Sequence, residues 1–192
     1  MIEQLLHSYL SGEVFTAFDT ETTGLNPSYE KVIEIGAVKF DKTGILDTYS
    51  VLINPEKVIS REITNITGIT NEMVCGCNNF SEIAPSFLNF INETKLIAHN
   101  SNFDVRFINS ELDKTQYKNL TKGQCNAIDT VKVARKVFPG LPYYKLQFLA
   151  NHFNINVDAA HRAYDDARVC MELFLLCMKE AAKKLGCAVN LL

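Results

Sequence analysis

The chain has 192 residues, 47% of them hydrophobic, which is enough to bury one good core, so we expect a single domain over residues 1–192. No apolar run approaches the roughly 18 residues of a membrane span, and the start lacks the basic segment of a secretion signal, so we expect a cytoplasmic protein. A net charge of −3, from 19 basic and 22 acidic residues, excludes a broadly basic nucleic-acid surface but not a few local contacts.

The N-terminal quarter of the chain predicts one short helix and then a meander of three strands. An apolar stripe within residues 2–10 has helical spacing and should pack on the rest of the fold. Strands are predicted over 14–18, 32–40 and 44–53, and the sequence DKTG at 41–44 is typical of a hairpin turn between the last two.

The remaining segments alternate helices with short strands, which is the order of an α/β fold. Ser81, with Glu82 close behind, is predicted to cap a helix over 83–91, and a buried strand follows at 96–98. A helix begins after Asn102, and an edge strand is expected at 128–130. Further helices are predicted at 131–137, at 145–151 after a break at Pro139, Gly140 and Pro142, and from about 161 onward.

Two acidic residues end the first predicted strand. Asp19 and Glu21 are two positions apart, so a strand directs both side chains to the same face. Such carboxylates repel one another unless a cation joins them. The alternative for an isolated pair of this kind is a solvated strand end before a turn.

Further acidic residues lie where helices begin. Asp104 is predicted in the first turn of the helix after Asn102, and Asp166 in the first turn of the longest helix, five positions after His161. Taken singly, each aspartate is better explained as a group that caps and complements the helix N-terminus than as a metal ligand.

Three segments together carry a family resemblance. The sequences FDTETTG at 18–24, HNSNFD at 99–104 and HRAYDD at 161–166 resemble, in this order, the three motifs of the DnaQ-like, or DEDDh, 3′–5′ exonucleases. The resemblance covers about 14–176 and is nearest to the proofreading domains, or epsilon-type subunits, of bacterial DNA polymerase III and their free-standing relatives. It implies a ribonuclease H-like fold, a mixed five-stranded sheet flanked by helices.

The resemblance also implies a catalytic site. Asp19, Glu21, Asp104 and Asp166 would bind two divalent ions, Mg²⁺ or Mn²⁺, which prefer oxygen ligands. His161 would be the general base that accepts a proton from the attacking water. The predicted reaction hydrolyses the 3′-terminal phosphodiester and releases nucleoside 5′-monophosphates.

The adjacent aspartates near residue 166 differ in their expected roles. Asp166 precedes a small residue, as the family's aspartate does, whereas Asp165 is expected to face outward or to support the site. Asp166 and Arg162 are four positions apart, so on a helix they share a face and their side chains can come into contact.

Substrate contacts are implied around the same motifs. Thr22 and Gly24 would present donors to the terminal nucleotide, while Leu25, Ile66 and Phe103 would supply apolar contacts to the last bases. Core packing explains Ile66 and Phe103 equally well, and His99 either positions substrate or is structural. Basic residues that are candidates for phosphate contacts, or else form solvated helix faces, are Lys132, Arg135, Lys136, Lys145, Arg162 and Arg168.

The partners are expected to be 3′ ends of single-stranded DNA, with RNA as the alternative, and possibly a DNA polymerase. The short apolar stretch 187–192 leaves no long polymerase-binding tail, so a free-standing enzyme is favoured over a docked proofreading subunit. A catalytically inactive binding module is the least favoured alternative, and the oligomeric state is open. The six cysteines lack zinc-site spacing and are expected to be free thiols.

Overall fold

A five-stranded mixed sheet forms the centre of the computed structural model, which describes residues 1–118, 120 and 127–186. The strand order is β3-β2-β1-β4-β5. Antiparallel pairing joins β1 to β2 and β2 to β3, whereas β4 runs parallel to β1 and β5 parallel to β4. The strands are β1 (Phe15–Thr22), β2 (Val32–Asp41), β3 (Gly44–Leu52), β4 (Lys95–Ala98) and β5 (Ile128–Asp129). The predicted fold is thereby confirmed.

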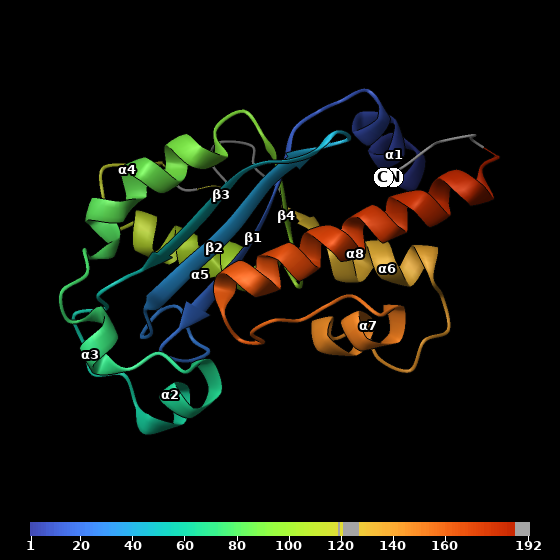
Figure 1. Cartoon of the computed structure of the whole chain (residues 1–192). Helices are drawn as coiled ribbons and strands as arrows, with labels where there is room; N and C mark the ends of the chain where they lie inside the picture. The colour runs from blue at the N-terminus through green and yellow to red at the C-terminus, as the bar shows by residue number, and fades with distance from the viewer. Residues whose placement is uncertain (119, 121–126, 187–192) are drawn as a thin grey trace.

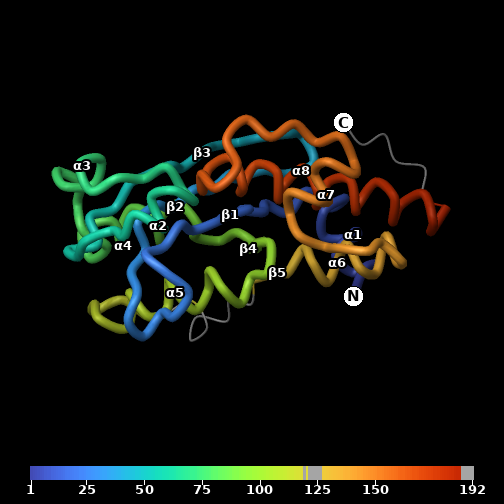
Figure 2. Tube along the Cα trace, turned by 90° about the horizontal axis from the view of Figure 1, so that it is seen from below, coloured from blue at the N-terminus to red at the C-terminus, as the bar shows by residue number. Residues whose placement is uncertain are grey.

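Helices cover both faces of this sheet (Figure 1). The long helix α8 (Ala163–Lys184) lies across one face, where α1 (Ile2–Leu10), α6 (Thr130–Val137) and α7 (Leu146–Phe153) share its apolar core. The other face is covered by α4 (Phe80–Ile91) and α5 (Asn102–Leu112). Figure 2 shows α8 and α5 on opposite sides of β1.

The alternation of side chains along β1 separates these two cores. Phe15 and Ala17 are fully buried on the α8 face, and Phe18 is fully buried on the α4 and α5 face. Because the period of a strand is two, Asp19 and Glu21 continue the row of Phe15 and Ala17. This alternation agrees with the sequence-based expectation that the side chains of Asp19 and Glu21 share a face of the sheet.

The start of α8 packs directly on the backbone of β2. Gly36 pairs with Asp19 in the register of β1 and β2. A Cβ atom at position 36 would lie 2.1 Å from the carbonyl carbon of Ala163 and 2.1 Å from the backbone nitrogen of Tyr164. Only glycine permits this approach, which brings the first turn of α8 over the strand end that carries Asp19.

Several predicted boundaries differ from the structure. β1 extends beyond residue 18 to Thr22, because its polar end continues to pair with β2. The capping residue of α4 is Asn79 rather than Ser81: the Asn79 side chain accepts a bond from the Glu82 amide, and the Glu82 carboxylate accepts one from the Asn79 amide.

Two short helices were not predicted, α2 (Arg61–Thr67) and α3 (Asn71–Val74). They lie beyond the end of the sheet at which β1 finishes (Figure 1). Their N-cap residues, Ser60 and Thr70, accept bonds from backbone amides three positions later and are the sequence signal that would have located them.

In the described part of the chain, no helix is both long enough and apolar enough to span a membrane. The thiols of Cys75, Cys77, Cys170 and Cys177 are free, as predicted, whereas Cys125 and Cys187 lie outside the described residues.

Candidate active site

The two carboxylates of β1 lie in an environment that disfavours their charge. Burial raises the pKa of Glu21 to about 8, and the charges of Asp166, Glu34 and Asp104 act in the same direction. The pKa of Asp19 is raised well above its usual range by burial first, and then by the charge of Asp104. These shifts describe a crowded acidic site, which a cation would neutralise.

Asp104 reaches this site from α5 and is held there by β1. It is 2% exposed. Its Oδ1 atom accepts hydrogen bonds from the backbone amide of Thr20 at 3.0 Å and from the Thr20 hydroxyl at 2.7 Å. Burial raises the pKa of Asp104 to about 7, although the bonds from Thr20 act in the opposite direction. Sequence reasoning missed Thr20, whose only signal was its position between Asp19 and Glu21.

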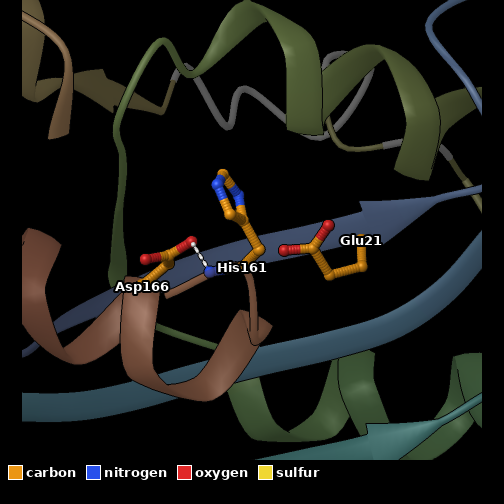
Figure 3. Close-up of side chains that lie close together, drawn as sticks. All are labelled: Glu21, His161 and Asp166. Atoms are coloured by element: carbon orange, nitrogen blue, oxygen red, sulfur yellow. Dashed lines mark hydrogen bonds between the residues drawn. The ribbon is translucent and has the colours of Figure 1, made fainter. Parts of the chain in front are cut away.

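Asp166 and His161 come together at the start of α8. Asp166 Oδ2 accepts a hydrogen bond from the backbone amide of His161 at 3.2 Å, and Gln147 Nε2 lies 3.4 Å from Asp166 Oδ1. Burial raises the pKa of Asp166 to about 6, and the charge of His161 opposes this shift. Potential ligand atoms of Glu21, His161 and Asp166 all lie within 4.8 Å of one another. Figure 3 shows the Glu21 and Asp166 carboxylates on either side of the exposed His161 side chain.

An ion pair between Arg162 and a buried carboxylate anchors the segment that carries His161. Glu34 of β2 is 1% exposed and accepts hydrogen bonds from the Arg162 guanidinium, the shortest at 2.7 Å, and from the Ala163 amide at 2.9 Å. Arg162 and Asp166 therefore meet only through the backbone, where the Asp166 amide donates to the Arg162 carbonyl at 3.0 Å, and the expected pairing of their side chains is wrong because the Arg162 guanidinium points toward β2. Glu34 was missed, and its signal was an acidic residue within an otherwise apolar strand.

Asp165 does not face outward, which corrects one of the two predicted possibilities. It is buried, and its carboxylate accepts bonds from the backbone amides of Asp158 and Ala159, each at 2.9 Å, and from Arg168. The segment before α8 folds over this side of the helix, so Asp165 contacts that segment instead of water.

A cleft of about 610 Å³ opens beside these residues. Its floor contains Asp19, Glu21, Asp104, His161 and Asp166, so one space is shared by the predicted catalytic residues. Its walls come from the start of α5 and from α6 with the segment that leads into α7. Wall residues include Phe103, Arg135, Tyr143, Tyr144 and Lys145.

The predicted substrate residues divide into two groups. His99 and Phe103 line the cleft, whereas Leu25 and Ile66 are exposed and do not line it. Neither Thr22 nor Gly24 lines it: the Thr22 hydroxyl donates to the Gly24 carbonyl at 2.6 Å and so braces the turn after β1.

His99 has a structural explanation. Its Nε2 atom lies 2.8 Å from the Tyr144 carbonyl, which can only accept, and its Nδ1 atom lies 2.9 Å from the Thr130 hydroxyl. Burial lowers the pKa of His99, so the neutral ring is favoured. His99 thus joins β4 to α6 and to the wall of the cleft.

Residues 16–174 match the sequence profile of the RNase_T exonuclease family. The chain belongs to the DnaQ-like (DEDDh) 3′–5′ exonucleases. This exonuclease is 48% identical over 178 residues to the DNA polymerase III subunit epsilon of Treponema pallidum (strain Nichols), covering 92% of this chain and 81% of that one.

Two further comparisons extend this relationship. A PolC-type DNA polymerase III of Caldanaerobacter subterraneus subsp. tengcongensis is 40% identical over 177 residues, which are 92% of this chain but 12% of that protein. The fold is similar to the nuclease domain of 3′hExo, a DEDDh family member bound to rAMP, with a TM-score of 0.74 and 18% identity, covering 94% of this chain and 96% of that one. At this identity the likeness concerns the fold alone.

The donor set of this exonuclease fits the divalent-metal dependence of its family. The groups that converge are carboxylates whose pKa values are raised by burial and by one another. Hard cations such as Mg²⁺ and Mn²⁺ take such oxygen ligands and relieve this repulsion when they bind.

Proposed function

We propose that this exonuclease hydrolyses the 3′-terminal phosphodiester of single-stranded DNA and releases nucleoside 5′-monophosphates. Two Mg²⁺ or Mn²⁺ ions would be held by Asp19, Glu21, Asp104 and Asp166. The observation that carries the proposal is the convergence of Glu21, Asp166 and His161, whose ligand atoms lie within 4.8 Å of one another in an open cleft. When bound, such ions polarise the phosphodiester and stabilise the leaving oxygen.

His161 is proposed as the general base. Its side chain is exposed to the cleft, so a water molecule can reach the imidazole ring. Its backbone is held by Asp166 and, through Arg162 and Ala163, by Glu34. The ring can then accept the proton from the attacking water while its position stays constant.

The terminal nucleotide is proposed to bind between the floor of the cleft and Phe103. Phe103 is partly exposed on α5 and packs on Phe107, with ring centroids 4.9 Å apart. A supported aromatic ring grips any base by stacking, which suits an enzyme that removes nucleotides of every sequence. Contacts from Thr22, Gly24, Leu25 and Ile66 remain predictions of the family resemblance.

Association with a replicative DNA polymerase is proposed as the setting of this activity. The sequence-based preference was for a free-standing enzyme, and it rested on the short stretch 187–192, which lies outside the described residues. The relatives support the alternative, since one is named a DNA polymerase III subunit and others are PolC-type polymerases. The proposed role is then proofreading in the cytoplasm.

The test of the reaction uses 5′-labelled single-stranded DNA and RNA of the same sequence. Wild type, Asp166→Ala and the control Asp47→Ala, which removes an exposed carboxylate of β3, are compared with Mg²⁺, with Mn²⁺ and with EDTA. A metal-dependent ladder that shortens from the 3′ end, retained in Asp47→Ala and lost in Asp166→Ala, is expected, with DNA digested faster than RNA. No shortening of either polymer by wild type would overturn the proposed function.

A test of the setting measures binding to a purified replicative polymerase. Faster removal of a mismatched 3′ terminus in the presence of the polymerase is expected for a proofreading subunit. Equal rates with and without polymerase, and no complex on gel filtration, would restore the free-standing alternative.

A further inference from the structure

Some basic residues near the active site already form ion pairs with carboxylates of the protein, and others do not. The Arg162 guanidinium is paired with buried Glu34, and the Arg168 guanidinium is paired with Asp165 and Glu172. Arg162 joins the start of α8 to β2, and Arg168 joins α8 to the segment before it. They are therefore poor candidates for binding a phosphate, because such binding would leave buried carboxylates unpaired.

Arg135 and Lys145 are different. Both are exposed and line the cleft with the catalytic residues, and within the described ranges neither forms an ion pair with a carboxylate. They are consequently available to phosphate groups. Single-stranded nucleic acids bind largely through cations that neutralise their phosphates, so unpaired cations in the wall of the cleft are suited to the phosphates of the strand.

The Arg135 side chain is held in place by an aromatic ring. Its guanidinium carbon lies 4.6 Å from the centre of the Tyr144 ring. The Tyr144 hydroxyl donates to the Phe138 carbonyl at 2.6 Å, and the Tyr144 carbonyl accepts from His99 at 2.8 Å. A guanidinium stacked on an anchored ring loses little freedom when it binds an anion.

An exposed aromatic ring lies in the same wall. Tyr143 is 61% exposed although it lines the cleft. Its ring packs edge-on against Phe148, with centroids 5.5 Å apart, which supports it from within. Exposed aromatic rings beside cations are the usual means of binding single strands without reading their sequence.

We propose that Arg135, Tyr143 and Lys145 form a second substrate-binding wall, which binds the single-stranded nucleotides next to the terminal one. Arg135 and Lys145 bind phosphates of the strand, and Tyr143 stacks on a base. This inference rests on the proposed function and adds to it a binding surface in the same cleft as Phe103. None of the contacts distinguishes one base from another.

The first experiment measures steady-state digestion of single-stranded DNA over a range of salt concentrations. Variants Arg135→Gln, Lys145→Gln and Tyr143→Ala are compared with two controls. Lys136→Gln removes the neighbouring exposed cation of α6, and Tyr29→Ala removes an aromatic ring that is 76% exposed; neither lines the cleft.

The expected result is a KM raised about 10-fold in each wall variant, with kcat within about twofold of wild type. Loss of one phosphate contact should also make the dependence of log KM on log salt shallower by about 0.7. The controls should match wild type. Unfolding curves should show that all variants are folded, with small shifts for Arg135→Gln and Tyr143→Ala, which each lose one contact with an aromatic ring.

A second experiment locates the phosphate that Arg135 binds. Substrates carry a single uncharged methylphosphonate linkage at successive positions from the 3′ end. One position should raise the KM of wild type and leave that of Arg135→Gln unchanged. Absence of any such position, or wild-type KM values in all three variants, overturns the second wall while the exonuclease activity stands. Failure of wild type to digest any substrate overturns the proposed function instead.

Discussion

Thr20 donates two hydrogen bonds to a single oxygen of Asp104, from its backbone amide at 3.0 Å and from its hydroxyl at 2.7 Å. The two residues are 84 positions apart, and both are buried. This contact joins the end of β1 to the first turn of α5. The carboxylates from two of the three sequence motifs are thereby held in a constant relationship before any cation binds.

Thr20→Val tests this contact, because it removes the hydroxyl bond and preserves the shape of the side chain. We expect the Mg²⁺ concentration for half-maximal activity to rise about 10- to 100-fold, as for other residues that orient metal ligands. Thr16→Val is the matched control, since its buried hydroxyl bonds Thr94 at 2.9 Å. Equal metal dependence of the two variants would show that Thr20 does not orient Asp104.

Gly36→Ala is expected to disrupt the site although position 36 binds nothing there. A methyl group would lie 2.1 Å from the backbone of Ala163 and Tyr164, so the start of α8 must move. Overpacking of this kind costs about 1–3 kcal/mol of unfolding free energy, and kcat should fall at least tenfold as His161 and Asp166 shift. Urea unfolding and single-turnover digestion measure both effects. Gly76→Ala, where a methyl group meets nothing within 4 Å, is the control.

His161→Asn separates catalysis from folding. His161 has φ of 61°, a left-handed conformation that asparagine adopts readily, so the backbone should be preserved. Removal of a general base is expected to lower kcat by about 10²- to 10⁴-fold with an unchanged unfolding curve. The exposed His7 supplies the control His7→Asn. A kcat within threefold of wild type would exclude His161 as the base.

Without metal, the exonuclease is expected to be less stable at pH 8 than at pH 5. The pKa values of Asp166, Asp104 and Glu21 are raised to about 6, 7 and 8, so the folded chain binds more protons than the unfolded chain as pH rises above about 4. The free energy of unfolding that these bound protons contribute is lost as the pH rises through the pKa values of the folded chain.

Thermal unfolding in EDTA and in Mg²⁺ at pH 5, 6, 7 and 8 tests this dependence. The melting temperature in EDTA should fall with pH, while Mg²⁺ should remove the fall at pH 7 and 8 by stabilising the ionised carboxylates. Glu21→Gln should make the fall shallower. A melting temperature in EDTA that rises from pH 5 to pH 8 would contradict the raised pKa values.

The local periodicity of the sequence determined much of the secondary structure and the placement of the four acidic residues on it. The period of two in a strand puts Asp19 and Glu21 on one face, and helical spacing places Asp104 and Asp166 in first turns, as the structure has them. These features depend on neighbours within a few residues, which any sequence displays directly. The five-stranded sheet was predicted from the family resemblance, which the three motifs carry by their order along the chain.

Only the tertiary structure decided which groups pair across the fold. Glu34 holds Arg162 although the two are 128 positions apart, and Asp165 contacts the segment before α8 instead of water. The same packing leaves Arg135 and Lys145 without a carboxylate partner among the described residues, whereas Arg168 has several. Such partners are set by how helices and strands pack, and this depends on contacts between distant segments that no local pattern encodes.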